Sequence, residues 1–486
     1  MKRLALAVVL VAALAAAALI ACATNPATGR SQLILVSAEK EREMGLSAVP
    51  GVMEEFGAYD DPALAQWVSG IGKGLAAKTE RPELPYQFTV LDSPVVNAFA
   101  LPGGPTFVTR GLIAHADSEA ELAGVMGHEI GHVVARHGAE QASRGQLLNL
   151  GLGAASIARP ELQRFGQLLG AGAQMLLLRY SRDAEREADM LGVRYIGRAG
   201  YEPTAMSRFL GVLDQLAQES GKSLPGWLST HPDPGERVAT TLRLARAAPA
   251  PANPRVGREE LLARVDGLVF GDDPRQGFQK GLTFHHPQLR FRFDLPEGWK
   301  AINTRAAVAA TDDEEKPTAQ LALRLAPADA AQLSPAAFVE RLKQKNPNAS
   351  FDGAAAVQNG VDAWRGAIVV HGDSGATRLS AVFARVEGRL YQFLGATSDE
   401  AKRPALDRAL RSLRPETDPA ALGVRPVVVR LAKVPAGTAL PEFCAQRKDL
   451  GAPCKVVGDL NHLPSDARAA GTATWKYPVR QSAVYP

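Results

Sequence analysis

The segment from His128 to His132 carries two histidines and a glutamate at spacings that suit metal chemistry. On a helix, His128 and His132 lie four residues apart, so their Cβ atoms are about 5–6 Å apart and both imidazoles can reach one ion. Zinc lowers the pKa of bound water towards roughly 7, and the carboxylate of Glu129 could then take its proton. The pattern predicts one zinc ion per chain with Glu129 as general base. A chance H-E-x-x-H in a solvated helix is the alternative.

A catalytic zinc ion usually takes three protein ligands. Downstream, several carboxylates stand on one predicted helix, SRDAEREAD. Glu185 and Asp189 are four residues apart and share a face, whereas Glu187 points elsewhere. We therefore assign Glu185 to zinc and Asp189 to a hydrogen bond with the free ring N–H of a ligand histidine. Glu187, with Arg182 and Arg186, fits an ordinary solvent-facing helix surface.

His128 and His132 lie on one face only if the segment that contains them is helical. The stretch 118–138 opens with Ser118 and Glu121 in a capping-box pattern and ends at Gly138, which predicts that helix. Before it, residues 86–113 alternate and are rich in β-branched and aromatic side chains around a Gly-Gly turn. This pattern predicts a strand, a turn and a second strand.

Taken together, these motifs resemble peptidase family M48, the group of the CAAX prenyl protease and the HtpX-like peptidases. The family pattern is HExxH followed by ExxxD, and the resemblance covers about residues 30–245. It implies a mainly helical zincin-type domain in which Glu185 is the third ligand and an edge strand lies near the metal. The matching stretches are HEIGH at 128–132, NAFALPGG at 97–104, Ser181 with Arg182, EREAD at 185–189 and STHPDPGER at 229–237.

Two further parts of the site follow from this resemblance. Residues Asn97, Ala98, Phe99 and Ala100 are a candidate edge strand that pairs with an extended substrate by β-augmentation, and an ordinary structural hairpin is the alternative. His231 lies in a proline-containing loop, where a lone histidine is usually a surface residue. In soluble M48 proteins this loop lies over the active-site cleft, so His231 is a candidate fourth zinc ligand or oxyanion donor.

The amino terminus resembles a bacterial lipoprotein signal peptide. Lys2 and Arg3 precede an apolar run that stops at LIAC, residues 19–22, which resembles a lipobox. Cys22 would carry the lipid, and Ala23 rather than aspartate is typical of outer-membrane lipoproteins. We expect a periplasmic protein that a lipid on Cys22 holds to a membrane, with the outer membrane favoured. A retained membrane-spanning anchor is the alternative.

The rest of the chain predicts a multidomain α+β protein. The Pro/Ala-rich stretch AAPAPANPR marks a boundary, and beyond it strands flank one helix. The stretch FDLPEGW gives a weak resemblance to PsbP, and the tail resembles a degenerate LysM module. The expected parts are a signal peptide at 1–21, the zinc peptidase domain at 22–246, a linker at 247–279, a small α+β domain at 280–415 and a short β-containing tail at 416–486.

Two other features are open to two interpretations each. Cys444 and Cys454 are a candidate disulfide in an oxidising compartment, and two unpaired thiols are the alternative. Residues 145–178 are rich in Gly, Ala and Leu and nearly uncharged. We interpret them as buried or lid-like helices rather than a membrane-touching segment.

Composition and motifs together favour one function. A formal net charge of +4 over 486 residues, without a basic run, gives no reason to expect nucleic acid as a partner. We expect a zinc endopeptidase that acts on misfolded or unassembled proteins of the cell envelope. A non-catalytic assembly or chaperone factor with a silenced metal site is the main alternative. Peptidoglycan, for which the tail is the only indication, and envelope assembly machinery are further candidate partners.

Overall fold

The computed structural model describes residues 22–151, 180–220, 231, 234–249, 251–313, 316–372 and 375–481. Its elements form an α+β mixture, as the sequence predicts. Residue contacts divide the chain into two compact units. The first comprises Met1–Gly271 with Val428–Val479, and the second comprises Asp272–Val427 with Arg480–Pro486. The expected signal peptide at 1–21 and most of the segment 145–178 lie outside the described residues.

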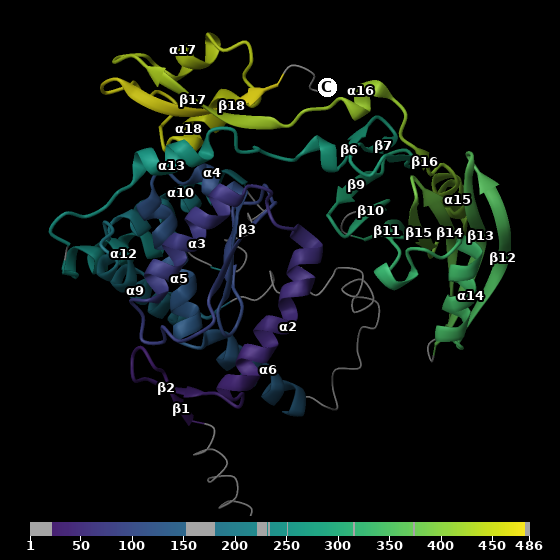
Figure 1. Ribbon diagram of the computed structural model, residues 1–486, viewed down its shortest axis with the longest axis horizontal. Helices are drawn as coiled ribbons and strands as arrows, with labels where there is room; N and C mark the ends of the chain where they lie inside the picture. The colour runs from purple at the N-terminus through teal and green to yellow at the C-terminus, as the bar shows by residue number, and fades with distance from the viewer. Residues whose placement is uncertain are drawn as a thin grey trace, which may run out of the picture. The chain divides into compact units, whose positions relative to one another are not determined.

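Helices form most of the first unit (Figure 1). The long helices bury apolar faces in one shared core, to which α3, α5, α9 and α10 contribute. The helices are α2 (Ala38–Phe56), α3 (Pro62–Ala76), α4 (Arg110–His115), α5 (Glu119–Val134), α6 (His137–Gly151), α9 (Arg182–Arg198), α10 (Ala205–Ser220), α12 (Pro234–Ala247) and α13 (Arg258–Val265).

A three-stranded sheet accompanies these helices, in the order β3 (Gln87–Leu91), β5 (Pro105–Thr109), β4 (Ala98–Ala100). Strands β4 and β5 form the predicted hairpin, with Phe99 paired to Phe107. Gly103 in the connecting turn has φ 80°, a conformation that favours glycine. Strand β4 is an edge of this sheet, and β3 lies parallel to β5 on the other side.

Helix α5 starts where the sequence predicts and ends earlier. The Oγ atom of Ser118 accepts a hydrogen bond from the backbone N–H of Glu121, and Glu121 in turn accepts from the N–H of Asp117. The predicted end at Gly138 is wrong, because the helix ends at Val134 and Arg136 adopts φ 61°. An ion pair between Arg136 and buried Glu41, with N–O distance 2.8 Å, holds this unusual backbone. The chain therefore turns, and His137 begins α6.

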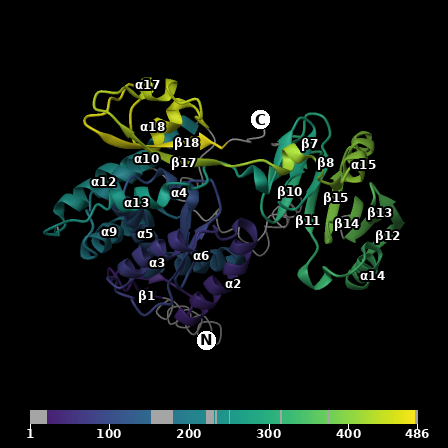
Figure 2. The same ribbon diagram turned by 45° about the horizontal axis from the view of Figure 1, so that its top comes forward.

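Most of the carboxy-terminal tail, Val428–Val479, belongs to the first unit. Strand β17 (Val427–Val434) pairs with β18 (Ala473–Arg480), and helices α17 (Leu440–Ala445) and α18 (Cys454–Leu460) lie between them in sequence. Val429 and Leu460 enter the core of the helical domain. The Nζ atom of buried Lys476 donates to the carbonyls of Ala114 and Ala116, at 3.0 and 2.5 Å. Figure 2 shows these strands beside α13 and α4.

The region 247–279 differs from the linker that the sequence predicts. It contains α13, whose residues Leu261, Leu262 and Val265 are buried in the same core. The sequence did not predict this helix, because it follows a proline-rich stretch, has only about two turns and lacks a side-chain cap at Gly257.

The second unit is built on a seven-stranded antiparallel sheet in the order β12-β13-β14-β15-β11-β10-β9. Helix α14 packs in the hydrophobic core on one face of this sheet, and helix α15 packs in the core on the opposite face. The unit comprises β6 (Phe278–Lys280), β7 (Thr283–His286), β8 (Phe291–Asp294), β9 (Lys300–Asn303), β10 (Ala307–Thr311), β11 (Ala319–Leu325), α14 (Pro335–Lys345), β12 (Ala349–Gln358), β13 (Val361–Gly372), β14 (Gly375–Val386), β15 (Arg389–Thr397), α15 (Arg403–Arg411), β16 (Arg414–Pro415) and α16 (Pro419–Leu422).

Candidate metal centre

Helices α5 and α9 approach closely enough to join their polar side chains. A Cβ atom at Gly192 would lie 3.0 Å from the backbone nitrogen of His128, and one at Gly131 would lie 3.0 Å from the carbonyl oxygen of Ala188. Glycine at both positions therefore permits this contact between helices. Ser181 caps α9 by accepting from the N–H of Ala184, which places Glu185 in the first turn.

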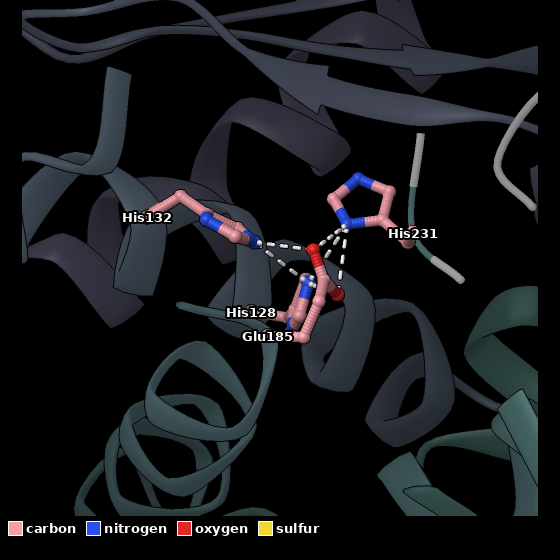
Figure 3. Close-up of side chains that lie close together, drawn as sticks. All are labelled: His128, His132, Glu185 and His231. Atoms are coloured by element: carbon pink, nitrogen blue, oxygen red, sulfur yellow. Dashed lines mark hydrogen bonds and ion pairs between the residues drawn. The ribbon is translucent and has the colours of Figure 1, made fainter. Parts of the chain in front are cut away.

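Four side chains converge where these helices meet (Figure 3). They are His128 and His132 from α5, Glu185 from α9, and His231 from the loop before α12, all at most 2% exposed. One ligand atom from each lies within 4.8 Å of every other. The structure thus brings together the predicted zinc ligands and the candidate fourth ligand, across a sequence separation of 103 residues between His128 and His231.

The donor atoms fit a zinc ion in number, type and spacing. The Nε2 atoms of His128 and His132 are 3.0 Å apart, and they lie 3.5 and 3.6 Å from oxygens of Glu185. Tetrahedral zinc with bonds of about 2.0–2.1 Å places its ligand atoms roughly 3.3–3.4 Å apart. Two imidazole nitrogens that face one another in a buried site are also a donor pair that zinc prefers.

Asp189 and Arg237 support the ligands. The Oδ1 atom of Asp189 lies 3.0 Å from Nδ1 of His128, which is the geometry that the assigned role of Asp189 requires. Arg237 donates to both carboxylate oxygens of Asp189 at 2.6 and 2.8 Å, and its Nη1 atom lies 2.9 Å from Glu185. The sequence motif contained Arg237, but nothing in it revealed this double contact.

His231 stands between the ligands and the candidate base. Its Nδ1 atom is 2.9 Å from Oε1 of Glu185 and 3.3 Å from Nε2 of His128, and its Nε2 atom is 3.5 Å from Oε1 of Glu129. A surface position for His231 is therefore wrong, since the residue is 1% exposed. Tyr180 completes the aromatic surroundings, with its ring stacked on that of His132 at a centroid distance of 4.0 Å.

The charges of the site favour a bound cation. Burial and Arg237 lower the pKa of His128, but hydrogen bonds with Asp189 and Glu185 outweigh them and raise it to about 9. Burial alone would raise the pKa of Glu185, yet His231 and the hydrogen bond with His128 hold it well below its usual range. Burial and neighbouring His128 lower the pKa of His132. The buried carboxylates thus stabilise a positive charge beside them, which is a proton on His128 in the metal-free site and which a bound metal cation would replace.

Glu187 does not face solvent as the sequence predicts. Its Oε2 atom lies 3.2 Å from Nε2 of His137, and Nδ1 of His137 lies 2.9 Å from Nδ1 of His132. Burial would raise the pKa of Glu187, but hydrogen bonds with His137 and Thr28 lower it. The prediction failed because the turn at Arg136 brings His137 over α9, and helical periodicity cannot anticipate that turn.

The candidate edge strand lies on the sheet as expected. Asn97 and Ala98 are buried, Phe99 stacks on Phe107, and Ala100 is partly exposed. The Oδ1 atom of Asn97 is buried and has no hydrogen-bond partner among the described residues. Its binding of substrate stays a prediction.

Two remaining predictions concern cysteines. The sulfur atoms of Cys444 and Cys454 are 2.00 Å apart, so the pair is joined in a disulfide. Cys22 lies in strand β1 (Cys22–Thr24), which pairs with β2 (Ser31–Leu33). Within the described ranges, no helix combines the length and apolar character needed to span a bilayer.

Comparison with known proteins agrees with the site. The chain is 30% identical over 260 residues to a β-barrel assembly-enhancing protease of Yersinia pestis, covering 51% of this chain and 53% of that protein. It is 34% identical over 221 residues to the mitochondrial metalloendopeptidase OMA1 of Schizosaccharomyces pombe, covering 44% of this chain and 63% of the relative. The chain thus spans about half to two thirds of these relatives.

A solution structure of cyanobacterial PsbP from Synechocystis aligns with 27% of this chain and 91% of its own, at 16% identity and a TM-score of 0.23. The PsbP-like assignment stays a prediction. For the helical domain, residues 62–245 match the family described as Peptidase family M48, and this range contains the whole cluster of His128, His132, Glu185 and His231. Residues 62–245 of this chain are therefore similar to the peptidase domain of family M48.

Proposed function

We propose that this chain is a zinc-dependent metalloendopeptidase that hydrolyses peptide bonds of misfolded or unassembled cell-envelope proteins. The observation that carries this proposal is the buried donor set of His128, His132 and Glu185, with the carboxylate of Glu129 beside it. The match of residues 62–245 to peptidase family M48 supports the reaction. The name of the Yersinia relative, a β-barrel assembly-enhancing protease, supports the class of substrate.

The residues of the site divide the work of peptide hydrolysis. His128, His132 and Glu185 would hold a zinc ion, which when bound supplies Lewis-acid polarisation of the carbonyl and of the attacking water. Glu129 takes a proton from that water and passes it to the leaving amine. Asp189 accepts the Nδ1 hydrogen of His128, so the neutral ring directs the lone pair of Nε2 into the donor set.

Substrate binding is assigned to the edge of the small sheet. An extended peptide would add to β4 and complete the sheet by backbone hydrogen bonds. Strand β4 is an edge of this sheet, so one side of its backbone faces no neighbouring strand among the described residues. We further infer a zincin-type fold for the peptidase domain, because α5 carries both histidines beside the sheet.

The test of the reaction is cleavage of casein and of an unfolded outer-membrane protein by the purified chain. The Glu129→Gln variant should bind zinc as the wild type does and lose cleavage, since only the proton acceptor is removed. Glu259→Gln is the matched control, because Glu259 lies exposed on α13. If wild type and Glu129→Gln both hold zinc and neither cleaves either substrate, the non-catalytic assembly factor becomes the better proposal.

The proposed location is the periplasm, with a lipid on Cys22 holding the chain to the outer membrane. The LIAC sequence supports this proposal. Cys22→Ala should move the protein from the membrane fraction to the soluble fraction while leaving cleavage in vitro intact. Retention of an unprocessed Cys22→Ala chain in the membrane would instead favour the spanning anchor.

A further inference from the structure

A chain of hydrogen bonds begins on the side of His132 that faces away from the donor set. The Nε2 atom of His132 faces His128 and Glu185, whereas its Nδ1 atom lies 2.9 Å from Nδ1 of His137. The Nε2 atom of His137 then lies 3.2 Å from Oε2 of Glu187. His132 and His137 are each 2% exposed, so water does not readily replace these contacts.

Metal binding by His132 fixes the direction of every hydrogen bond from His132 through His137 to Glu187. If Nε2 of His132 is a metal ligand, it carries no hydrogen, and the neutral ring must be protonated on Nδ1. His132 therefore donates to Nδ1 of His137. The ring of His137 then carries its hydrogen on Nε2 and donates it to the carboxylate of Glu187. Each ring has one permitted tautomer, and a carboxylate ends the chain.

The amino-terminal segment provides the last donors. The Nδ2 atom of Asn25 donates to Oε1 of Glu187 at 2.8 Å, and the hydroxyl of Thr28 donates to the same oxygen at 2.5 Å. Asn25 is 1% exposed, and its Oδ1 atom accepts from the backbone N–H groups of Ala27 and Thr28 at 2.9 and 3.3 Å. These bonds fix the turn that presents both donors to Glu187.

We propose that His137 and Glu187 are positioning residues for the metal ligand His132, and that the turn Asn25–Thr28 is part of the same support. This inference rests on the proposed function, because it takes His132 as a zinc ligand. The turn begins three residues after Cys22, the candidate lipid acceptor. Hydrogen bonds thereby connect the segment that follows the proposed lipid anchor to the metal centre. Displacement of the turn Asn25–Thr28 should weaken metal binding.

The test measures zinc affinity by competition with a chromogenic chelator. Glu187→Met removes the acceptor at nearly constant side-chain length, and we expect zinc to bind about 10–100-fold more weakly. Glu187→Gln retains an acceptor oxygen for His137 and should restore most of that affinity. The double variant Asn25→Ala, Thr28→Val should fall between these two. Asp183→Asn is the control, since Asp183 is an exposed carboxylate of the same helix.

Two readouts separate positioning from general destabilisation. The visible spectrum of the Co²⁺-substituted protein should change in Glu187→Met and His137→Phe, because the orientation of the ligand ring changes, and should match wild type in Asp183→Asn. The melting temperature of each metal-free variant shows whether the fold itself is weakened. Wild-type zinc affinity and Co²⁺ spectrum in Glu187→Met and His137→Phe would overturn the proposal.

Failure of this proposal is distinguishable from failure of the proposed function. These measurements report metal binding and not proteolysis. If the variants bind zinc like the wild type, the protease assignment remains, and His132 does not depend on His137 and Glu187 for its position. If the wild-type chain cleaves nothing, the protease assignment is lost, but the differences in zinc affinity among the variants still support the positioning role.

Discussion

His231 contacts the carboxylate of Glu185, with Nδ1 of the imidazole 2.9 Å from Oε1 of the acid. The same ring reaches Glu129 with its other nitrogen, at 3.5 Å. A residue so placed occupies the space between the proposed metal ligands and the proposed base. It can either fill the fourth position around zinc or donate to the developing oxyanion, and these roles predict opposite effects on proteolysis.

We expect His231→Ala to raise basal casein cleavage, because the buried ring excludes water and substrate from the donor set. The rate should be measured with a fluorogenic casein at saturating zinc, together with the zinc coordination number from X-ray absorption. A fall in kcat by a factor of about 10²–10³ would assign His231 to the oxyanion instead. Unchanged activity with unchanged coordination would exclude both roles.

The acidic residues of α9 should differ in their effect on metal binding. Glu185→Gln removes an anionic ligand and should cause the largest loss of zinc affinity. Asp189→Asn should weaken zinc binding or activity by about 10–100-fold, because the amide no longer accepts the His128 hydrogen as a carboxylate does. Chelator competition on both variants gives the comparison. If Asp183→Asn, a change at an exposed residue, lost as much zinc affinity as these variants, the prediction that only Glu185 and Asp189 face the metal centre would be contradicted.

Much of the site was predictable because helical periodicity is local. His128 and His132 are four residues apart, as are Glu185 and Asp189, so each pair was predicted to share one face of its helix. In the structure these two helix faces contact each other. The contribution of His137 was not predictable, since it depends on the positive φ of Arg136 and the distant Glu41 that holds it. The hairpin of β4 and β5 was predictable from alternation and the glycine turn, whereas the separate strand β3 and its parallel pairing with β5 were not.

The unpredicted features share a physical cause, which is long sequence separation. Arg237 reaches Asp189 across 48 residues, and Asn25 reaches Glu187 across 162. No local propensity encodes such contacts. The helix α13 and the docking of the tail were missed for the same reason, because their apolar residues complete a core formed mainly by other segments.

Arg237 should be essential for the arrangement of two carboxylates. Its guanidinium binds Asp189 through two nitrogens and Glu185 through a third, a fork that an ammonium group cannot reproduce. We expect Arg237→Lys to lower both zinc affinity and the melting temperature, since breaking a buried ion pair costs about 3–5 kcal/mol. Arg243→Lys on the exposed side of α12 is the control. Equal zinc affinity and melting temperature in the two variants would refute this role.

The buried amine of Lys476 should make the stability of the first unit depend on pH. Burial lowers the pKa of Lys476 from 10.5 to about 8, against the opposite effects of Asp117 and Glu121, while Arg258 lowers it further. The amine donates to the carbonyls of Ala114 and Ala116, just before α5.

Between about pH 8 and pH 10.5 the unfolded chain binds more protons at Lys476 than the folded chain does. The free energy of unfolding contributed by this residue therefore rises with pH in that window, by about 1.4 kcal/mol per pH unit, and is constant below it. Lys476→Met should lack this rise, so the melting temperature of the wild type should gain on that of the variant as the pH increases from 8 to 10. Lys433→Met, an exposed lysine on β17, is the control and should follow the wild type. A constant difference between wild type and Lys476→Met across this range would show that the amine does not titrate there.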